Sequence, residues 1–89
     1  MSVFNIVLFM WIVYILKCSD NTYYVGCTND ITDRIQRHEK GDLHYTSSRL
    51  PVTIVHQSVF FDKYKAYKFE IYLKSGSGRA FAKKHLHSF

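Results

Sequence analysis

An apolar stretch from Val3 to Leu16, interrupted only by Asn5, restricts most strongly what this chain can fold into. It is shorter than the roughly 20 apolar residues that a membrane-spanning helix needs. It also lacks the early positive charge and the small-residue cleavage site of a signal peptide, so we expect no membrane anchor. Residues 11–17 are rich in β-branched and aromatic side chains and predict a buried β-strand. Residues 1–10 are interpreted as an apolar N-terminal extension, and one hypothesis is that translation naturally starts at Met10.

A hairpin and a helix are predicted to follow this strand. Residues 19–21, Ser-Asp-Asn, mark a turn, and Thr22–Gly26 predicts a second strand, so the two strands form a β-hairpin. Gly26 ends it at a point where the backbone needs unusual torsions or a close approach. Capping residues at 28–30 and the apolar spacing of Ile31 and Ile35 predict a helix through about residue 39.

The second half of the chain is predicted to add a strand and two helices. Residues 40–51 show no periodicity and contain glycine, serines and proline, which predicts a surface loop. Val52–Phe61 reads as a third strand, Asp62 can cap a helix to about residue 74, and Ser77 can open a last helix to about residue 86. The order is then β-β-α-β-α-α, which predicts an α+β fold class with a small three-stranded sheet flanked by helices in a single domain, residues 11–89.

Charge and cysteine content indicate the kind of partner and compartment. A formal net charge of +5 and a pI near 9.3 favour a polyanion such as nucleic acid. Cys18 and Cys27 are predicted at opposite ends of the hairpin, too far apart for a disulfide, which fits a reducing cytoplasm. Seven of the basic residues crowd into the last third of the chain and predict a basic C-terminal surface: Lys63, Lys65, Lys68, Lys74, Arg79, Lys83 and Lys84.

A few polar residues could do chemistry, although each also has a plain structural explanation. Arg34 and His38 stand four apart on one helix and can address one ligand, or can simply belong to a solvated helix face. Glu70 falls among apolar positions of its helix, where a carboxylate needs either a basic partner or a metal ion. Tyr14 and Tyr24 lie in the two hairpin strands, where tyrosine commonly packs for structural reasons.

Taken together and in order, these residues resemble the motif of the GIY-YIG nuclease superfamily. The matching segments are Ile12-Val13-Tyr14 and Tyr24-Val25-Gly26, followed by Arg34, His38 and, on a later helix, Glu70. The chain looks most like the short stand-alone bacterial proteins of the UPF0213 type. Two departures stand out: Ile12 replaces the leading glycine of the motif, and no asparagine follows Glu70, so Lys74 or Arg79 could supply phosphate contact instead.

The resemblance implies a metal-dependent hydrolase of nucleic-acid phosphodiesters built as an α/β sandwich around a three-stranded sheet. Tyr14 would be the general base toward water, with His38 helping to remove its proton and Tyr24 positioning water or phosphate. Arg34 would stabilise charge on the scissile phosphate. Glu70 would hold one Mg2+ or Mn2+ ion, because magnesium keeps several waters and needs few protein carboxylates. The expected nucleic-acid-binding residues are Arg34, Arg49, Lys74 and Arg79.

Two functions from different classes follow. The first is an endonuclease that cuts DNA rather than RNA, in DNA repair or in the processing of branched or single-stranded DNA. The second is a basic nucleic-acid-binding module that keeps the nuclease scaffold without cutting. The complete set of five motif residues favours the first, since binding alone would not require a core-facing carboxylate beside an anionic ligand.

Overall fold

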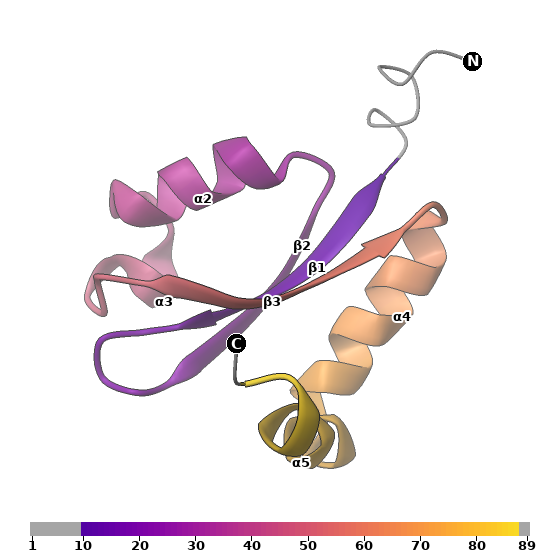
Figure 1. Cartoon of the computed structure of the whole chain (residues 1–89). Helices are drawn as coiled ribbons and strands as arrows, with labels where there is room; N and C mark the ends of the chain where they lie inside the picture. The colour runs from indigo at the N-terminus through magenta and orange to yellow at the C-terminus, as the bar shows by residue number, and fades with distance from the viewer. Residues whose placement is uncertain (1–9, 88–89) are drawn as a thin grey trace.

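The computed structural model describes residues 10–87, in which a three-stranded antiparallel sheet lies between two pairs of helices (Figure 1). The strand order is β2-β1-β3, so the first strand is central and the second lies at one edge. Two helices, α2 and α3, cover one face of the sheet, and α4 and α5 cover the other (Figure 1). The elements are β1 (Trp11–Lys17), β2 (Tyr23–Thr28), α2 (Ile31–Glu39), α3 (His44–Ser47), β3 (Thr53–Phe60), α4 (Lys63–Lys74) and α5 (Gly76–His85).

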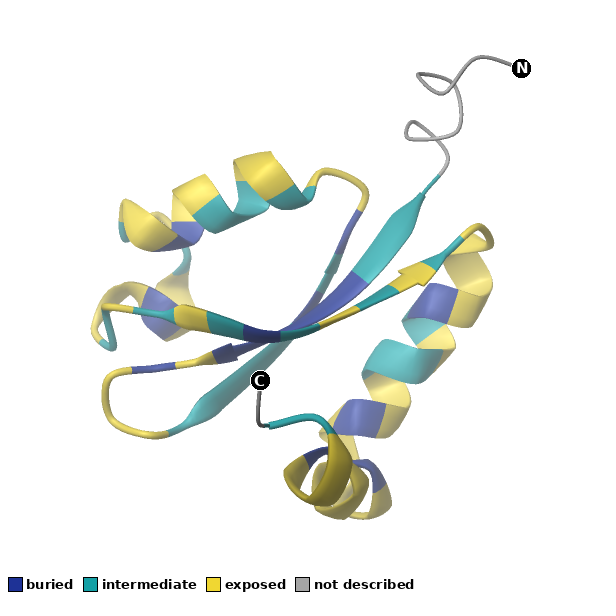
Figure 2. Ribbon diagram, viewed as in Figure 1, coloured by how far each residue is buried: buried dark blue, intermediate teal, exposed yellow. Residues whose placement is uncertain are grey.

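The central strand β1 supplies the core on both faces of the sheet. Its residues 13–16 are fully buried, whereas the outer faces of the helices are exposed (Figure 2). Because successive side chains of a strand point to opposite faces, β1 divides its residues between the two layers. Val13 and Ile15 pack in a cluster with Ala66 and Leu73 of α4, while Tyr14 points toward α2 and α3.

Capping side chains start the helices where the sequence predicts them. The Asp30 carboxylate accepts a hydrogen bond from the backbone N–H of Asp33 at 3.1 Å and begins α2. The Asp62 carboxylate accepts from the N–H of Tyr64 at 2.8 Å and begins α4. These contacts satisfy helix donors that have no partner within the helix.

The predicted α+β class, the three-stranded sheet and the order of its main elements are confirmed, with three local differences. The second strand does not end at Gly26: β2 continues to Thr28, because Cys27 and Thr28 still pair with β1. The predicted loop 40–51 contains the one-turn helix α3, which lacks the apolar periodicity of a longer helix. The last helix starts at Gly76 rather than after Ser77, because the Ser75 hydroxyl accepts from the N–H of Gly78 at 3.1 Å. Ser75 is thus both the C-cap of α4 and the N-cap of α5.

The predictions for the N-terminus and the cysteines have different outcomes. The proposed apolar extension, residues 1–10, lies outside the described residues except for Met10. Between residues 10 and 87, no helix combines the length and apolar character needed to cross a bilayer. Cys18 and Cys27 are both free thiols, as the hairpin geometry predicts.

Candidate active site

A chain of buried hydrogen bonds joins three elements on the α2 face of the sheet. The hydroxyl oxygen of Tyr14 lies 2.8 Å from Nε2 of His38, and Nδ1 of His38 lies 2.7 Å from Oγ1 of Thr46. All three residues are fully buried. The Thr46 hydroxyl donates to the carbonyl of Leu43 at 3.5 Å, so its oxygen is left to accept from Nδ1–H of His38. This pattern assigns the Nε2 lone pair to the Tyr14 O–H.

The position of Tyr14 depends on a glycine in the neighbouring strand. Tyr14 of β1 is paired directly with Gly26 of β2. A Cβ atom at position 26 would occupy the space of the Tyr14 ring and hydroxyl. Gly26 has no positive φ, so close approach, rather than unusual torsions, is what this position requires.

Burial keeps both members of the Tyr14–His38 pair neutral. It raises the pKa of Tyr14 well above its ordinary value, and the neighbouring Tyr24 raises it further, while Arg34 acts in the opposite direction. Burial also lowers the pKa of His38, helped by the positive charges of Arg34 and Arg37. Both shifts disfavour the charged form of the group, as expected where water is excluded.

Tyr24 covers this pair from the edge of the sheet. It is half-buried, and its ring centroid lies 6.2 Å from that of Tyr14 and 5.0 Å from that of His38. On its other side the ring lies 5.4 Å from Tyr45 of α3. Since Tyr14 is fully buried, Tyr24 is part of the cover between it and solvent.

The predicted metal-binding carboxylate lies on the other side of β2. Glu70 of α4 has a 21% exposed side chain and forms an ion pair of 3.2 Å with Lys74, one turn later. The sequence left open whether this carboxylate has a basic partner or binds a metal ion, and the structure shows a basic partner. Burial raises the pKa of Cys27 in β2, and the negative charge of Glu70 raises it further, whereas the positive charge of Arg34 lowers it. Both charged side chains therefore lie near Cys27. Arg34 from the α2 side of the sheet and Glu70 from the α4 side thus both approach the edge strand β2 next to Gly26.

Residues 10–84 match the GIY-YIG catalytic domain family. The chain belongs to this family. It is 43% identical over 63 residues to a UPF0213 protein of Halobacterium salinarum, covering 70% of this chain and 82% of that protein. It is 39% identical over 64 residues to a UPF0213 protein of Staphylococcus aureus strain Mu3, covering 71% of this chain and 78% of the relative.

The fold agrees with that of a solved relative. The solution NMR structure of a UPF0213 protein from Bacillus halodurans superposes with a TM-score of 0.55 at 34% identity. The match covers 84% of this chain and 81% of the relative. The predicted resemblance is therefore confirmed, and the GIY-YIG family is one of nucleases that generally use divalent metal ions.

The described residues near β2 offer a metal ion few protein ligands. Within residues 10–87 no three histidine, cysteine, aspartate or glutamate side chains gather closely enough to hold an ion together. Glu70 is the predicted donor, and it is engaged by Lys74. A single carboxylate fits a hydrated Mg2+ or Mn2+ ion that also binds substrate phosphate, and does not fit a closed structural site.

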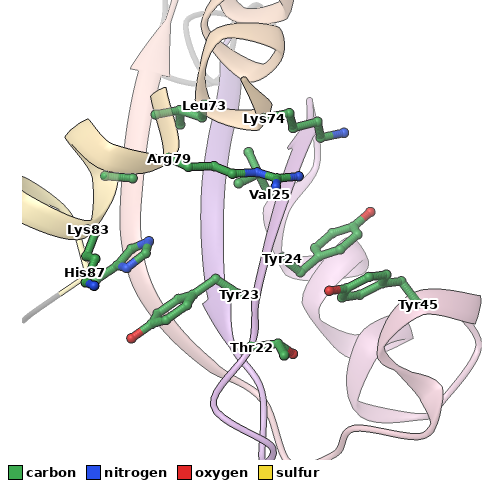
Figure 3. A pocket seen from close by; sticks show the side chains of 11 residues that line it. Thr22, Tyr23, Tyr24, Val25, Tyr45, Leu73, Lys74, Arg79, Lys83 and His87 are labelled. Atoms are coloured by element: carbon green, nitrogen blue, oxygen red, sulfur yellow. The ribbon is translucent and has the colours of Figure 1, made fainter. Parts of the chain in front are cut away.

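The predicted nucleic-acid-binding residues fall into three environments. Arg34 lies close enough to Tyr14 and His38 for its positive charge to lower the pKa values of both. Lys74 and Arg79 line a cavity along β2 (Figure 3). Arg49 is already engaged, because its guanidinium donates to Asp20 at 3.3 Å and to Thr22 at 3.2 Å and lies 4.4 Å from the ring centroid of Tyr45.

Thr46 is the polar residue of this site that the sequence did not single out. It belongs to α3, a segment that the sequence predicted as loop, and it contacts His38, which lies eight positions earlier in the chain. No periodic pattern marks a hydroxyl that becomes buried in an irregular segment. The feature of the sequence that could have pointed to Thr46 is the polar character of residues 44–49.

Proposed function

We propose that this chain is a divalent-metal-dependent endonuclease that hydrolyses DNA phosphodiester bonds, acting in the cytoplasm in DNA repair or processing. The observation that carries the proposal is the buried hydrogen bond of 2.8 Å between the Tyr14 hydroxyl and His38 Nε2. A neutral imidazole oriented by Thr46 can accept the proton of that hydroxyl. Such a pair is what general-base catalysis by tyrosine requires.

The raised pKa of Tyr14 favours a proton relay over a stable tyrosinate. In the relay, the attacking water gives a proton to the Tyr14 oxygen while Tyr14 gives its own proton to His38 Nε2. The water oxygen forms a bond to phosphorus as the bond to the leaving oxygen breaks, and the leaving oxygen, which departs with the bonding electron pair, takes a proton from solvent water. Tyr14 is neutral before and after, and the proton ends on His38. The imidazole begins neutral because its pKa is lowered.

Two charged side chains would act on the phosphate from opposite faces of the sheet. Arg34 would stabilise the negative charge that grows on the phosphate oxygens. Glu70 would hold the metal ion, which supplies Lewis-acid stabilisation of the phosphate when bound. Lys74 would release Glu70 in that state and turn toward the phosphate.

Access to Tyr14 requires a local movement. The tyrosine is fully buried, so a water molecule can reach its hydroxyl only if its cover opens. Tyr24 contacts both Tyr14 and His38 and is half-buried at the edge of the sheet. We assign Tyr24 the task of admitting and positioning the attacking water.

Two observations support the alternative, a binding module that does not cleave. Glu70 is paired with Lys74, and residues 10–87 contain no three-ligand cluster. If Lys74 permanently occupied Glu70, the basic surface would bind nucleic acid without a metal ion.

The deciding experiment is cleavage of labelled single-stranded, duplex and flapped DNA with Mg2+, Mn2+ or EDTA. Tyr14→Phe keeps the ring over Gly26 and removes the hydroxyl, so we expect its rate to fall by about 100-fold or more. Glu70→Gln should abolish metal-dependent cutting. The controls are Tyr64→Phe and Glu39→Gln, which alter exposed residues of the same types. Wild-type protein that binds but cuts none of these substrates with either metal would establish the binding module instead.

A further inference from the structure

A cavity of about 820 Å³ runs along the outer edge of β2, beside the candidate active site (Figure 3). Its volume lies within the roughly 300–1,000 Å³ of pockets that bind small ligands. Tyr23 and Val25 of β2 line it with Leu73 of α4 and Ala82 of α5. We call it the β2 cavity.

The charged residues that line the β2 cavity are all basic, although Glu70 lies next to one of them, Lys74. Lys74, Arg79 and Lys83 line it and are exposed, and no carboxylate is among its lining residues. In Figure 3 the side chain of Arg79 extends across Val25 toward the edge strand. An apolar floor beneath several cations suits a ligand that has both a flat apolar part and phosphate groups.

An aromatic stack in the wall of the cavity shows that the Tyr23 ring can hold a flat heteroaromatic ring. The imidazole of His87 lies on the Tyr23 ring with centroids 3.6 Å apart and planes inclined by 8°. Both residues line the β2 cavity. Unpaired nucleobases stack on tyrosine in the same parallel manner.

We propose that the β2 cavity binds one unpaired nucleotide of a single-stranded DNA segment. The base replaces the His87 imidazole on the Tyr23 ring, over the floor formed by Val25 and Leu73, and the adjoining phosphates contact Arg79 and Lys83. This inference rests on the proposed nuclease function and specifies its substrate as DNA with an unpaired strand next to the cut.

The β2 cavity adjoins the candidate active site through two of its lining residues. Tyr24, which lines it, also contacts Tyr14 and His38, and Lys74, which lines it, is bound to Glu70. A nucleotide held there places its neighbouring phosphodiester at the edge of β2. In the interior of a duplex both faces of each base are stacked on neighbours and none is free for Tyr23, so a flap or single-stranded end is the preferred substrate.

The test measures binding by fluorescence anisotropy with a labelled thymidine oligonucleotide and with a blunt duplex. A set of further oligonucleotides, each lacking the base at one position, is measured in the same way. EDTA is present throughout, so binding is measured without cleavage. We expect Tyr23→Ala to weaken binding of the normal oligonucleotide by about tenfold, the loss of one stacked base. Tyr23→Phe keeps the ring and should bind like wild type. One abasic position should weaken wild-type binding without weakening that of Tyr23→Ala.

A matched pair on α5 tests the phosphate contacts. Arg79→Ala and Lys84→Ala each remove one positive charge from an exposed position, but Lys84 does not line the β2 cavity. We expect a loss of severalfold for Arg79→Ala and less than about twofold for Lys84→Ala, since remote surface charges are screened by salt. Circular dichroism of each variant establishes that it is folded.

The results separate this inference from the nuclease proposal. The nucleotide site would be overturned if Arg79→Ala and Lys84→Ala lost the same affinity for the oligonucleotide. It would also be overturned if an abasic position weakened binding equally in wild type and Tyr23→Ala, or if duplex bound more tightly than the single strand. Binding that depends on Tyr23 in a protein that never cuts with Mg2+ or Mn2+ would support the site and refute the nuclease.

Discussion

Replacing Gly26 by alanine would place a methyl group where the Tyr14 ring now lies. The added Cβ would overlap the ring and hydroxyl of Tyr14. Tyr14 cannot retreat easily, because it is fully buried and its hydroxyl is bound to His38. Either the two strands separate locally, or the tyrosine leaves its rotamer and loses that hydrogen bond.

The expected cost follows from these two effects. Forcing extra volume into a packed core costs about 1–3 kcal/mol. Loss of the Tyr14–His38 hydrogen bond adds about 0.5–1.5 kcal/mol. For a domain of this size each kcal/mol lowers Tm by about 4–8 °C, so we expect Gly26→Ala to lower Tm by about 4 °C or more, and by about 6 °C or more if the hydrogen bond is also lost. Thermal and urea unfolding followed by circular dichroism measures the change.

Gly76→Ala is the matched control, because a Cβ at Gly76 meets no atom within 4 Å. Its free energy of unfolding should stay within about 0.5 kcal/mol of wild type. If Gly26→Ala is as stable as Gly76→Ala, the Tyr14 ring does not depend on the missing side chain.

Four further predictions concern the charges and hydroxyls around the site. Thr46→Val should lower the free energy of unfolding by about 1–3 kcal/mol by leaving Nδ1–H of His38 unpaired, and an unchanged urea midpoint would contradict the assigned hydrogen bond. The pKa of His38 is lower in the folded chain than its ordinary 6.5, so below about pH 6.5 the unfolded chain binds more protons and stability should fall. His38→Gln should flatten this part of the pH profile of urea unfolding. Arg49→Ala should cost about 1 kcal/mol through its lost ion pair and ring contact, measured by the same unfolding assay. Lys74→Met should lower the Mg2+ concentration for half-maximal cleavage at saturating DNA, since Glu70 loses its competitor, and a higher concentration would place the metal elsewhere.

The sequence predicted those parts of the fold that follow from local patterns. Asp30 and Asp62 cap helices in the structure as their positions before apolar-periodic segments suggest. The apolar run of β1 becomes the central strand, since four successive buried residues require cover on both faces. These features depend on neighbours a few positions away and can therefore be recognised without coordinates.

Contacts between distant segments set the limit of that prediction. The short helix α3 has no periodicity, so the burial of Thr46 against His38 was not predictable. Arg49 was expected among the nucleic-acid-binding residues, yet it is held by Asp20 from the β1–β2 turn, 29 positions away. Such pairings depend on how loops fold onto the sheet.

The edge position of β2 gives a physical reason why the site draws residues from both layers. Successive strand residues point to opposite faces, so Tyr24 reaches the α2 side and Val25 the α4 side. In a central strand these faces are separated by its neighbours, but at an edge they meet around one open side. A phosphodiester lying along β2 would therefore meet Arg34 from one layer and Glu70 from the other. Because Gly26 has no side chain, Tyr14 can approach the same edge from the centre of the sheet.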